Sequence, residues 1–215
     1  MIKDLKEMFL LAGLFALVMM IPVGIWHAFD FAGFKLKAVL WAAYYLVFTA
    51  AIAENFLRKR GLPWSYVGVS RGADLRRAAL VGTAFAAVSI ALGWFGAEFA
   101  GLRESGNSPL AKFLLEKLSL GFRGEVFLAF YMFPIALCEE LVFRGIIFSH
   151  LEKRRGFAFA LLASSLFFAL IHGTPARMIM TFFYGLAWGL SFRFGRSLAA
   201  PATAHYLHNV SAFYF

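Results

Sequence analysis

Two adjacent glutamates, Glu139 and Glu140, lie in a stretch of the chain that is otherwise almost wholly apolar, and Arg144 follows four residues after the second. A carboxylate at bilayer depth costs a few kcal/mol, so an acid in such a stretch indicates a functional site. Neighbouring helix positions point about 100° apart, and therefore the two carboxylates cannot face one partner. Residues four apart share a helix face, so Arg144 can pair with Glu140. We predict that this pair is structural and that Glu139 is left over for chemistry.

Four further polar residues interrupt later apolar segments: His172, His205, His208 and Asn209. His205 and Asn209 are spaced i and i+4 and share a helix face, with His208 on its flank. A carboxylate and an imidazole can activate a water molecule. An imidazole and an amide can hold the oxyanion that forms when water attacks an amide carbonyl. These residue types therefore indicate hydrolysis of an amide bond.

Other uses of the same residues remain open at this point. Two histidines and a glutamate could make a zinc site. A lone intramembrane histidine is commonly a hydrogen-bond partner between helices. The buried acid, base and arginine could also form a proton relay or an ion path. No serine, threonine or cysteine lies convincingly beside a base, and Cys138 next to Glu139 points away from it on a helix, so a covalent nucleophile is disfavoured.

The composition is that of a polytopic membrane protein. Of 215 residues, 61% are hydrophobic and only 15% are charged, whereas soluble domains carry about 25% charged residues. The net charge of +9 is explained by basic cytoplasmic loops. No basic face with a recognisable nucleic-acid module is present, so no nucleic-acid partner is expected.

The apolar segments predict an all-α transmembrane bundle of about seven spans in a single domain, 1–215. The expected spans are residues 6–29, 36–57, 78–100, 124–153, 157–172, 176–194 and 198 to the end. A basic connector is expected at 58–77 and a surface helix at 110–120. We divide the domain into N-terminal helices and connectors, 1–123, and catalytic helices, 124–215.

Charge and depth orient this bundle. The loops after the second, fourth and sixth spans are basic, and Lys3 and Lys6 would lie on the same side, which predicts a cytoplasmic N-terminus and an outside C-terminus. Counted at about 1.5 Å per residue, the candidate polar residues of three spans lie at similar depths and should face one another. Gly185 and Gly189 form a small-residue face that predicts close helix packing.

Three motifs in these spans resemble those of one protein family. They are E-E-x-x-x-R at Glu139, Glu140 and Arg144, F-x-x-x-H at Phe168 and His172, and H-x-x-x-N at His205 and Asn209. Together, and in this order, they resemble the CAAX protease and bacteriocin-processing family of glutamic-type intramembrane proteases, from about residue 125 onward.

The resemblance implies a role for each residue. Glu139 would be the general base, assisted by His172, and His205 with Asn209 would form the oxyanion site. Glu140 and Arg144 would hold the helix geometry, and Phe168 would pack near the site, with His208 in a supporting position. The family mechanism is metal-free and needs no cofactor.

The resulting hypothesis is an intramembrane endopeptidase of a prokaryotic cytoplasmic membrane. Its partners would be the bilayer and a membrane-anchored protein or peptide, cleaved near a C-terminal tail, a sorting signal or a bacteriocin-type segment. The chain ends six residues after Asn209, where family members commonly continue with another helix, so we expect the cavity wall there to differ and a prenylated eukaryotic-type substrate to be disfavoured. The alternative hypothesis is a non-catalytic immunity, scaffold or ion-path protein. The sequence predicts neither the exact substrate nor the oligomeric state.

Overall fold

The computed structural model describes residues 2–28, 34–99 and 122–212, and every regular element in these ranges is a helix. The elements are α1 (Ile2–Ala28), α2 (Phe34–Arg58), the 3-10 turn η1 (Trp64–Val67), α3 (Leu75–Phe99), α5 (Phe122–Glu140), the π-helix η2 (Leu141–Phe148), α6 (Ser149–Arg155), α7 (Phe157–Leu170), α8 (Pro175–Gly195) and α9 (Ala199–Ser211). The predicted all-α class is therefore confirmed. The expected surface helix at 110–120 lies outside the described residues.

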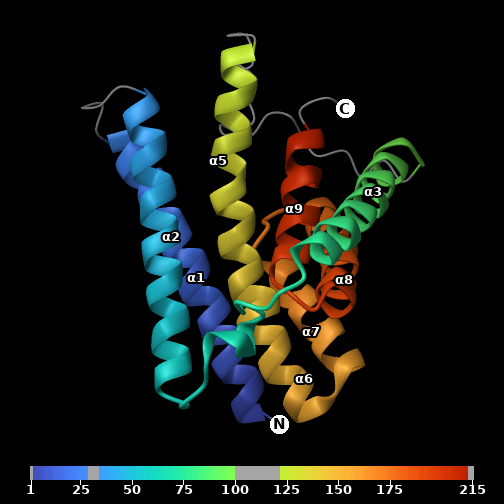
Figure 1. Cartoon of the computed structure of the whole chain (residues 1–215). Coiled ribbons are helices and arrows are strands. Elements are labelled where there is room, and N and C mark those ends of the chain that lie inside the picture. The colour runs from blue at the N-terminus through green and yellow to red at the C-terminus, as the bar shows by residue number, and fades with distance from the viewer. Residues whose placement is uncertain (1, 29–33, 100–121, 213–215) are drawn as a thin grey trace.

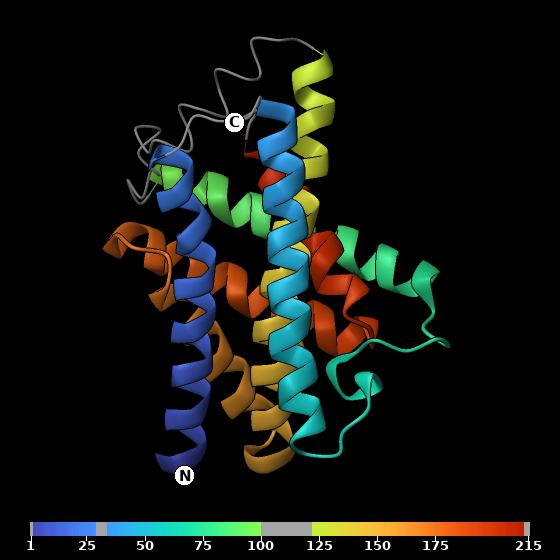
Figure 2. The ribbon, with the colours of Figure 1, turned by 90° about the vertical axis from the view of Figure 1, so that its left-hand side faces the viewer.

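The bundle is organised around the continuous rod formed by α5, η2 and α6 (Figure 1). On one side of this rod stand α1 and α2, which run lengthwise beside it (Figure 2). On the other side lie α7, α8 and α9, and α3 packs mainly on α9 and α8. Helices far apart in the sequence thereby surround the rod that carries the glutamate pair.

Close packing of α7 on α8 depends on the predicted small-residue face. A Cβ added at Gly185 would lie 2.9 Å from the Cβ of Ser165, and one added at Gly189 would lie 2.4 Å from Leu161 Cδ1. Both distances are shorter than non-bonded carbons tolerate. At Gly185 the Cα of Ser165 is also only 3.1 Å away, so glycine lets the two backbones approach closely, whereas at Gly189 the obstacle is the end of a flexible leucine side chain. The prediction made from Gly185 and Gly189 is confirmed.

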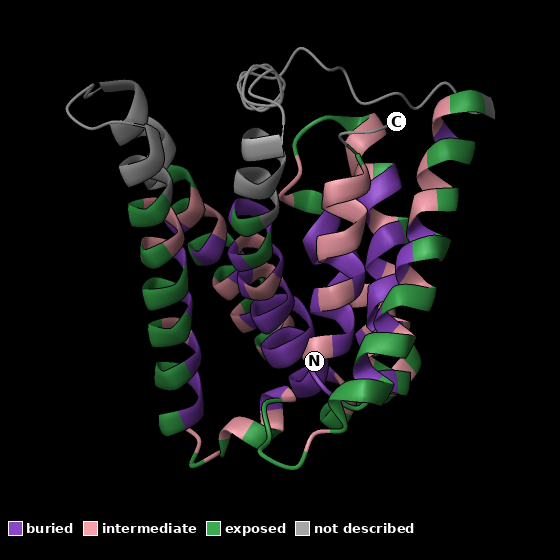
Figure 3. Cartoon of the chain, turned by 45° about the horizontal axis from the view of Figure 1, so that its top comes forward, coloured by how far each residue is buried: buried purple, intermediate pink, exposed green. Residues whose placement is uncertain are grey.

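The outward-facing sides of the helices are exposed (Figure 3), and many of the exposed side chains are large and apolar. Large side chains such as Leu10, Leu80 and Phe130 are 65–76% exposed. Two helical segments, Val39–Arg58 and Leu75–Glu98, are long and apolar enough to cross a membrane. In the most apolar 18-residue part of each, only 22% of the residues are buried. Helices with so little of their apolar surface inside the protein suit a lipid environment. The count of about seven spans and the sidedness of both termini stay predictions.

The basic segments that were expected on one side of the membrane gather at one end of the bundle. The side chain of Arg60, just after α2, binds Glu7 on α1. Arg154 on α6 binds Asp4 on α1 at 2.5 Å. The N-terminus and the ends of α2 and α6 therefore meet at one end of the bundle.

Candidate active site

The two glutamates end α5, at the point where the rod changes from an α-helix to a π-helix. A π-helix bonds residue i to i+5, and single turns of it are frequent at functional sites. All eight residues of η2 are buried. On the outside of η2, a Cβ added at Gly145 would lie 3.1 Å from Val67, so the η1 connector packs directly against the π segment. The sequence predicted one helix over 124–153, with a possible kink at Pro134, and did not reveal this change of register.

Glu140 and Arg144 form an ion pair in the interior. Arg144 Nη1 donates a hydrogen bond of 3.0 Å to Glu140 Oε1, and both side chains are 0% exposed. Arg144 Nη2 donates a second bond of 2.9 Å to the carbonyl oxygen of Gly185 on α8. Breaking such a buried pair by removing one partner is costly because the other charge is left uncompensated. The pair thus ties the π segment to α8.

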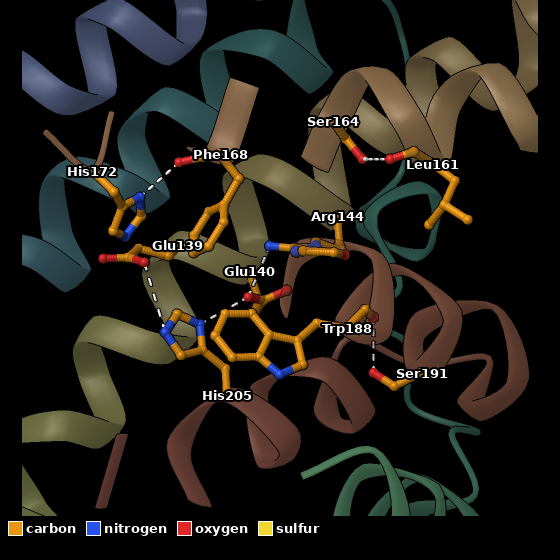
Figure 4. Close-up of polar contacts among 11 residues, drawn as sticks. Glu139, Glu140, Arg144, Leu161, Ser164, Phe168, His172, Trp188, Ser191 and His205 are labelled. Carbon is orange, nitrogen blue, oxygen red and sulfur yellow. Dashed lines mark hydrogen bonds and ion pairs between the residues drawn. The ribbon is translucent and has the colours of Figure 1, made fainter. Parts of the chain in front are cut away.

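His205 on α9 lies between the two carboxylates (Figure 4). Its Nδ1 is 2.8 Å from Glu140 Oε1, a hydrogen-bond distance, and its Nε2 is 3.8 Å from Glu139 Oε2. An ionised carboxylate only accepts hydrogen bonds, so the proton on this side of the ring is assigned to Nδ1. Glu140 therefore accepts from both Arg144 and His205, and Nε2 is directed toward Glu139.

The two carboxylates differ in their access to solvent. The Glu139 side chain is 16% exposed and makes no direct hydrogen bond in the described part of the chain, because 3.8 Å exceeds a hydrogen-bond length. The Glu140 side chain is fully enclosed. Glu139 is thus the more accessible carboxylate.

His172 lies just past the end of α7, in the turn that leads to α8. Its Nδ1 is 2.6 Å from the carbonyl oxygen of Phe168, which assigns the proton to Nδ1 and leaves Nε2 as an acceptor. Glu139 interacts electrostatically with His172, and Figure 4 shows the Glu139 carboxylate between the His172 and His205 rings. The structure therefore brings Glu139, His172 and His205 together.

Trp188 on α8 was not among the candidate residues and contacts several of them. Its ring stacks on His205 with centroids 3.9 Å apart and planes at 15°. The guanidinium of Arg144 lies 5.6 Å from the Trp188 ring and 4.7 Å from the Phe168 ring. Phe168 meets His205 edge-on at 5.8 Å. Aromatic contacts thus hold His205 and Arg144 from two sides. Trp188 lies one turn after Gly185, but the sequence carried no signal for its role, because the bond from Arg144 to the Gly185 carbonyl joins residues 41 apart.

Asn209 and His208 lie at the margin of this cluster. Asn209 is half-buried on α9, and no contact in the described ranges joins it to Glu139 or His172. His208 packs on Tyr184 with ring centroids 4.2 Å apart and meets Trp188 edge-on at 5.6 Å. His208 therefore contributes to the support of Trp188.

A metal centre was one of the open alternatives. Within the residues that the structure describes, no group of three or more His, Cys, Asp and Glu side chains is arranged to hold a metal ion. The Nδ1 atoms of His172 and His205 are committed to the Phe168 carbonyl and to Glu140. The site therefore presents the accessible carboxylate of Glu139 beside the imidazoles of His172 and His205, next to the compensated ion pair of Glu140 and Arg144.

The described helices thus combine one enclosed and one accessible glutamate, two histidines and apolar outer surfaces that suit a membrane. Residues 122–211 match the family model described as type II CAAX prenyl endopeptidase Rce1-like. The resemblance predicted from the three motifs is therefore confirmed over this segment. No curated protein and no solved structure matches the chain.

Proposed function

We propose that the protein is a glutamic-type intramembrane endopeptidase of a prokaryotic cytoplasmic membrane, which cleaves a peptide bond next to a membrane-embedded or membrane-anchored segment. The observation that carries the proposal is the pair of unlike carboxylates around His205. Glu140 is neutralised by Arg144 at 3.0 Å, whereas Glu139 is 16% exposed and directed toward both histidines. An accessible base beside an enclosed ion pair is suited to general base catalysis.

The first step is the activation of water. Glu139 takes one proton of the water molecule while Nε2 of His172 accepts a hydrogen bond from the other. The Nδ1–H of His172 donates to the Phe168 carbonyl at 2.6 Å, so this ring is held in the tautomer that the step requires. The water oxygen bonds to the substrate carbonyl carbon, and the electron pair of the carbonyl bond moves to the oxygen.

The second step is the stabilisation of the resulting oxyanion. Because Nδ1–H of His205 donates to Glu140, this residue can offer Nε2–H to an oxyanion only as an imidazolium. The neighbouring Glu140–Arg144 ion pair is charge-compensated, so a donor at this position acts in a low-dielectric interior. We assign Asn209 as a second donor that the bound substrate brings into the site. The intermediate collapses as the carbon–nitrogen bond breaks, and Glu139 returns its proton to the leaving amine.

The test uses the purified full chain in detergent and a panel of peptides that carry a hydrophobic C-terminal tail, with a farnesylated CAAX peptide in the same panel. Cleavage is followed by mass spectrometry for wild type and Glu139→Gln. We expect cleavage of a tailed peptide and a loss of at least about 100-fold in Glu139→Gln, the usual contribution of a general base. Glu54→Gln, a change of an exposed acid on α2, is the matched control and should cleave at the wild-type rate.

Two outcomes would overturn this proposal. Failure of folded wild-type protein to cleave any peptide of the panel would favour the non-catalytic alternative, an immunity, scaffold or ion-path protein. Loss of activity on chelation, restored by zinc, would replace the metal-free mechanism with a metal-dependent one.

A further inference from the structure

A second polar region lies at the opposite end of the molecule from the top of α5, where the N-terminus meets the ends of α2 and α6 (Figure 1). A cavity of about 790 Å³ opens there. Its walls come from α1, from the residue Arg60 after α2 and from Arg154 on α6. None of the residues of the candidate active site lines it.

The cavity has an excess of positive charge. Its charged lining residues are Lys3, Asp4, Lys6, Glu7, Arg60 and Arg154. The two carboxylates are engaged by the two arginines, in the pairs Glu7–Arg60 and Asp4–Arg154. These pairs fix the arginines to the walls and leave the lysines as the surplus charge. Lys3 and Lys6 are exposed, and at i and i+3 they lie on the same face of α1.

The same face of α1 becomes apolar immediately beyond the lysines. Leu10, which also lines the cavity, is 70% exposed, and Leu14 and Leu17 follow at 48% and 63%. The steps of three and four residues keep all of these side chains in one stripe along the helix. From Leu10 to Leu17 the stripe is about 10 Å long at 1.5 Å per residue. The two exposed lysines are thus followed, on the same helix face, by a stripe of exposed leucines.

We propose that this cavity is a binding site for an anionic phospholipid. The phosphodiester would sit between Lys3 and Lys6, and one acyl chain would lie along Leu10, Leu14 and Leu17. Basic pockets between transmembrane helices on the cytoplasmic side bind anionic headgroups in this way. The apolar stripe favours a lipid over free phosphate, because a soluble anion would gain nothing from three exposed leucines.

The experiment measures lipid binding to the purified full chain by native mass spectrometry, with phosphatidylglycerol and phosphatidylcholine as probes. We expect phosphatidylglycerol to bind more tightly than phosphatidylcholine. The double variant Lys3→Gln/Lys6→Gln should bind phosphatidylglycerol about 30-fold more weakly, since each cation near a membrane surface contributes about a factor of five. The matched control is Arg58→Gln/Lys59→Gln, which removes the same charge from exposed residues near the same end of the bundle but outside the cavity. It should change the affinity by less than about twofold.

Two further arms separate the lipid from its headgroup. Leu10→Asn/Leu14→Asn keeps both lysines and should also weaken phosphatidylglycerol binding. Glycerol phosphate, which has the headgroup chemistry without acyl chains, should not displace the lipid at equal concentration. If both charge variants lost phosphatidylglycerol affinity equally, the effect would come from general surface charge. If glycerol phosphate displaced the lipid, the cavity would be a phosphate site. Either result overturns the proposal. Because the readout is lipid binding, it is independent of whether the protein cleaves peptides.

Discussion

Replacing Arg144 by leucine tests the division of labour between the two glutamates most directly. The change removes the 3.0 Å bond to Glu140 and the 2.9 Å bond to the Gly185 carbonyl. It leaves Glu140, at 0% exposure, with His205 as its one hydrogen-bond partner among the described residues. Loss of one member of a buried ion pair costs about 3–5 kcal/mol. For a chain of about this size, 1 kcal/mol corresponds to about 2–4 °C in Tm, so we expect a decrease of about 6–20 °C.

Two further variants test whether Glu140, and not Glu139, depends on Arg144. Glu139→Gln changes a side chain that is 16% exposed and has no direct hydrogen bond among the described residues, so its Tm should stay within about 2 °C of wild type while peptide cleavage is lost. The double variant Glu140→Gln/Arg144→Leu removes both charges and should recover part of the lost stability, with a coupling energy of about 0.5–3 kcal/mol.

The assay is thermal unfolding in detergent, followed by intrinsic fluorescence, beside peptide cleavage for every variant. If Arg144→Leu were no less stable than Glu139→Gln, Glu140 would not depend on Arg144 for compensation. If the losses of the two single variants simply added in the double variant, the two charges would not be coupled. Either result would refute the structural assignment of the Glu140 pair.

Three more predictions follow from other contacts. Trp188→Leu removes the 3.9 Å stack on His205. We expect kcat to fall about tenfold or more, KM to change little and the pH–rate profile to shift. A purely structural role of Trp188 would leave the pH–rate profile in place. Gly185→Ala would bring a Cβ within 2.9 Å of a serine Cβ on α7 and should cost about 1–3 kcal/mol in unfolding experiments, while Gly13→Ala, where nothing lies within 4 Å, should show no such loss. Burial raises the pKa of Tyr66 above its ordinary value of 10.0. The folded protein therefore holds this proton more tightly than the unfolded chain, and stability should fall as pH rises above about 10; Tyr66→Phe should remove that part of the pH dependence in denaturation curves.

The helices and the glutamate–arginine pair were predictable because both depend on local spacing. Long hydrophobic segments form helices in a bilayer because a helix satisfies all backbone hydrogen bonds within the segment. Residues at i and i+4 meet on one helix face whatever surrounds them, so the contact between Glu140 and Arg144 needed no knowledge of the fold. The close approach at Gly185 and Gly189 was predictable for the same reason, since their spacing places both on one face. The three motifs carried the family resemblance without any geometry.

The contacts of His205 and Trp188 could not be read from spacing, because they join helices that are distant along the chain. Glu140 and His205 are 65 residues apart in sequence, and their 2.8 Å contact depends on how α9 packs against the end of α5. The π segment also has no local sequence signature, because Leu141–Phe148 has the composition of an ordinary apolar helix. Its π register accompanies tertiary contacts such as the close approach of Gly145 to Val67. The sequence determined that one glutamate would be paired and the other left over. Tertiary packing decided that one imidazole lies between both carboxylates, because only the packed bundle brings α9 to the end of α5.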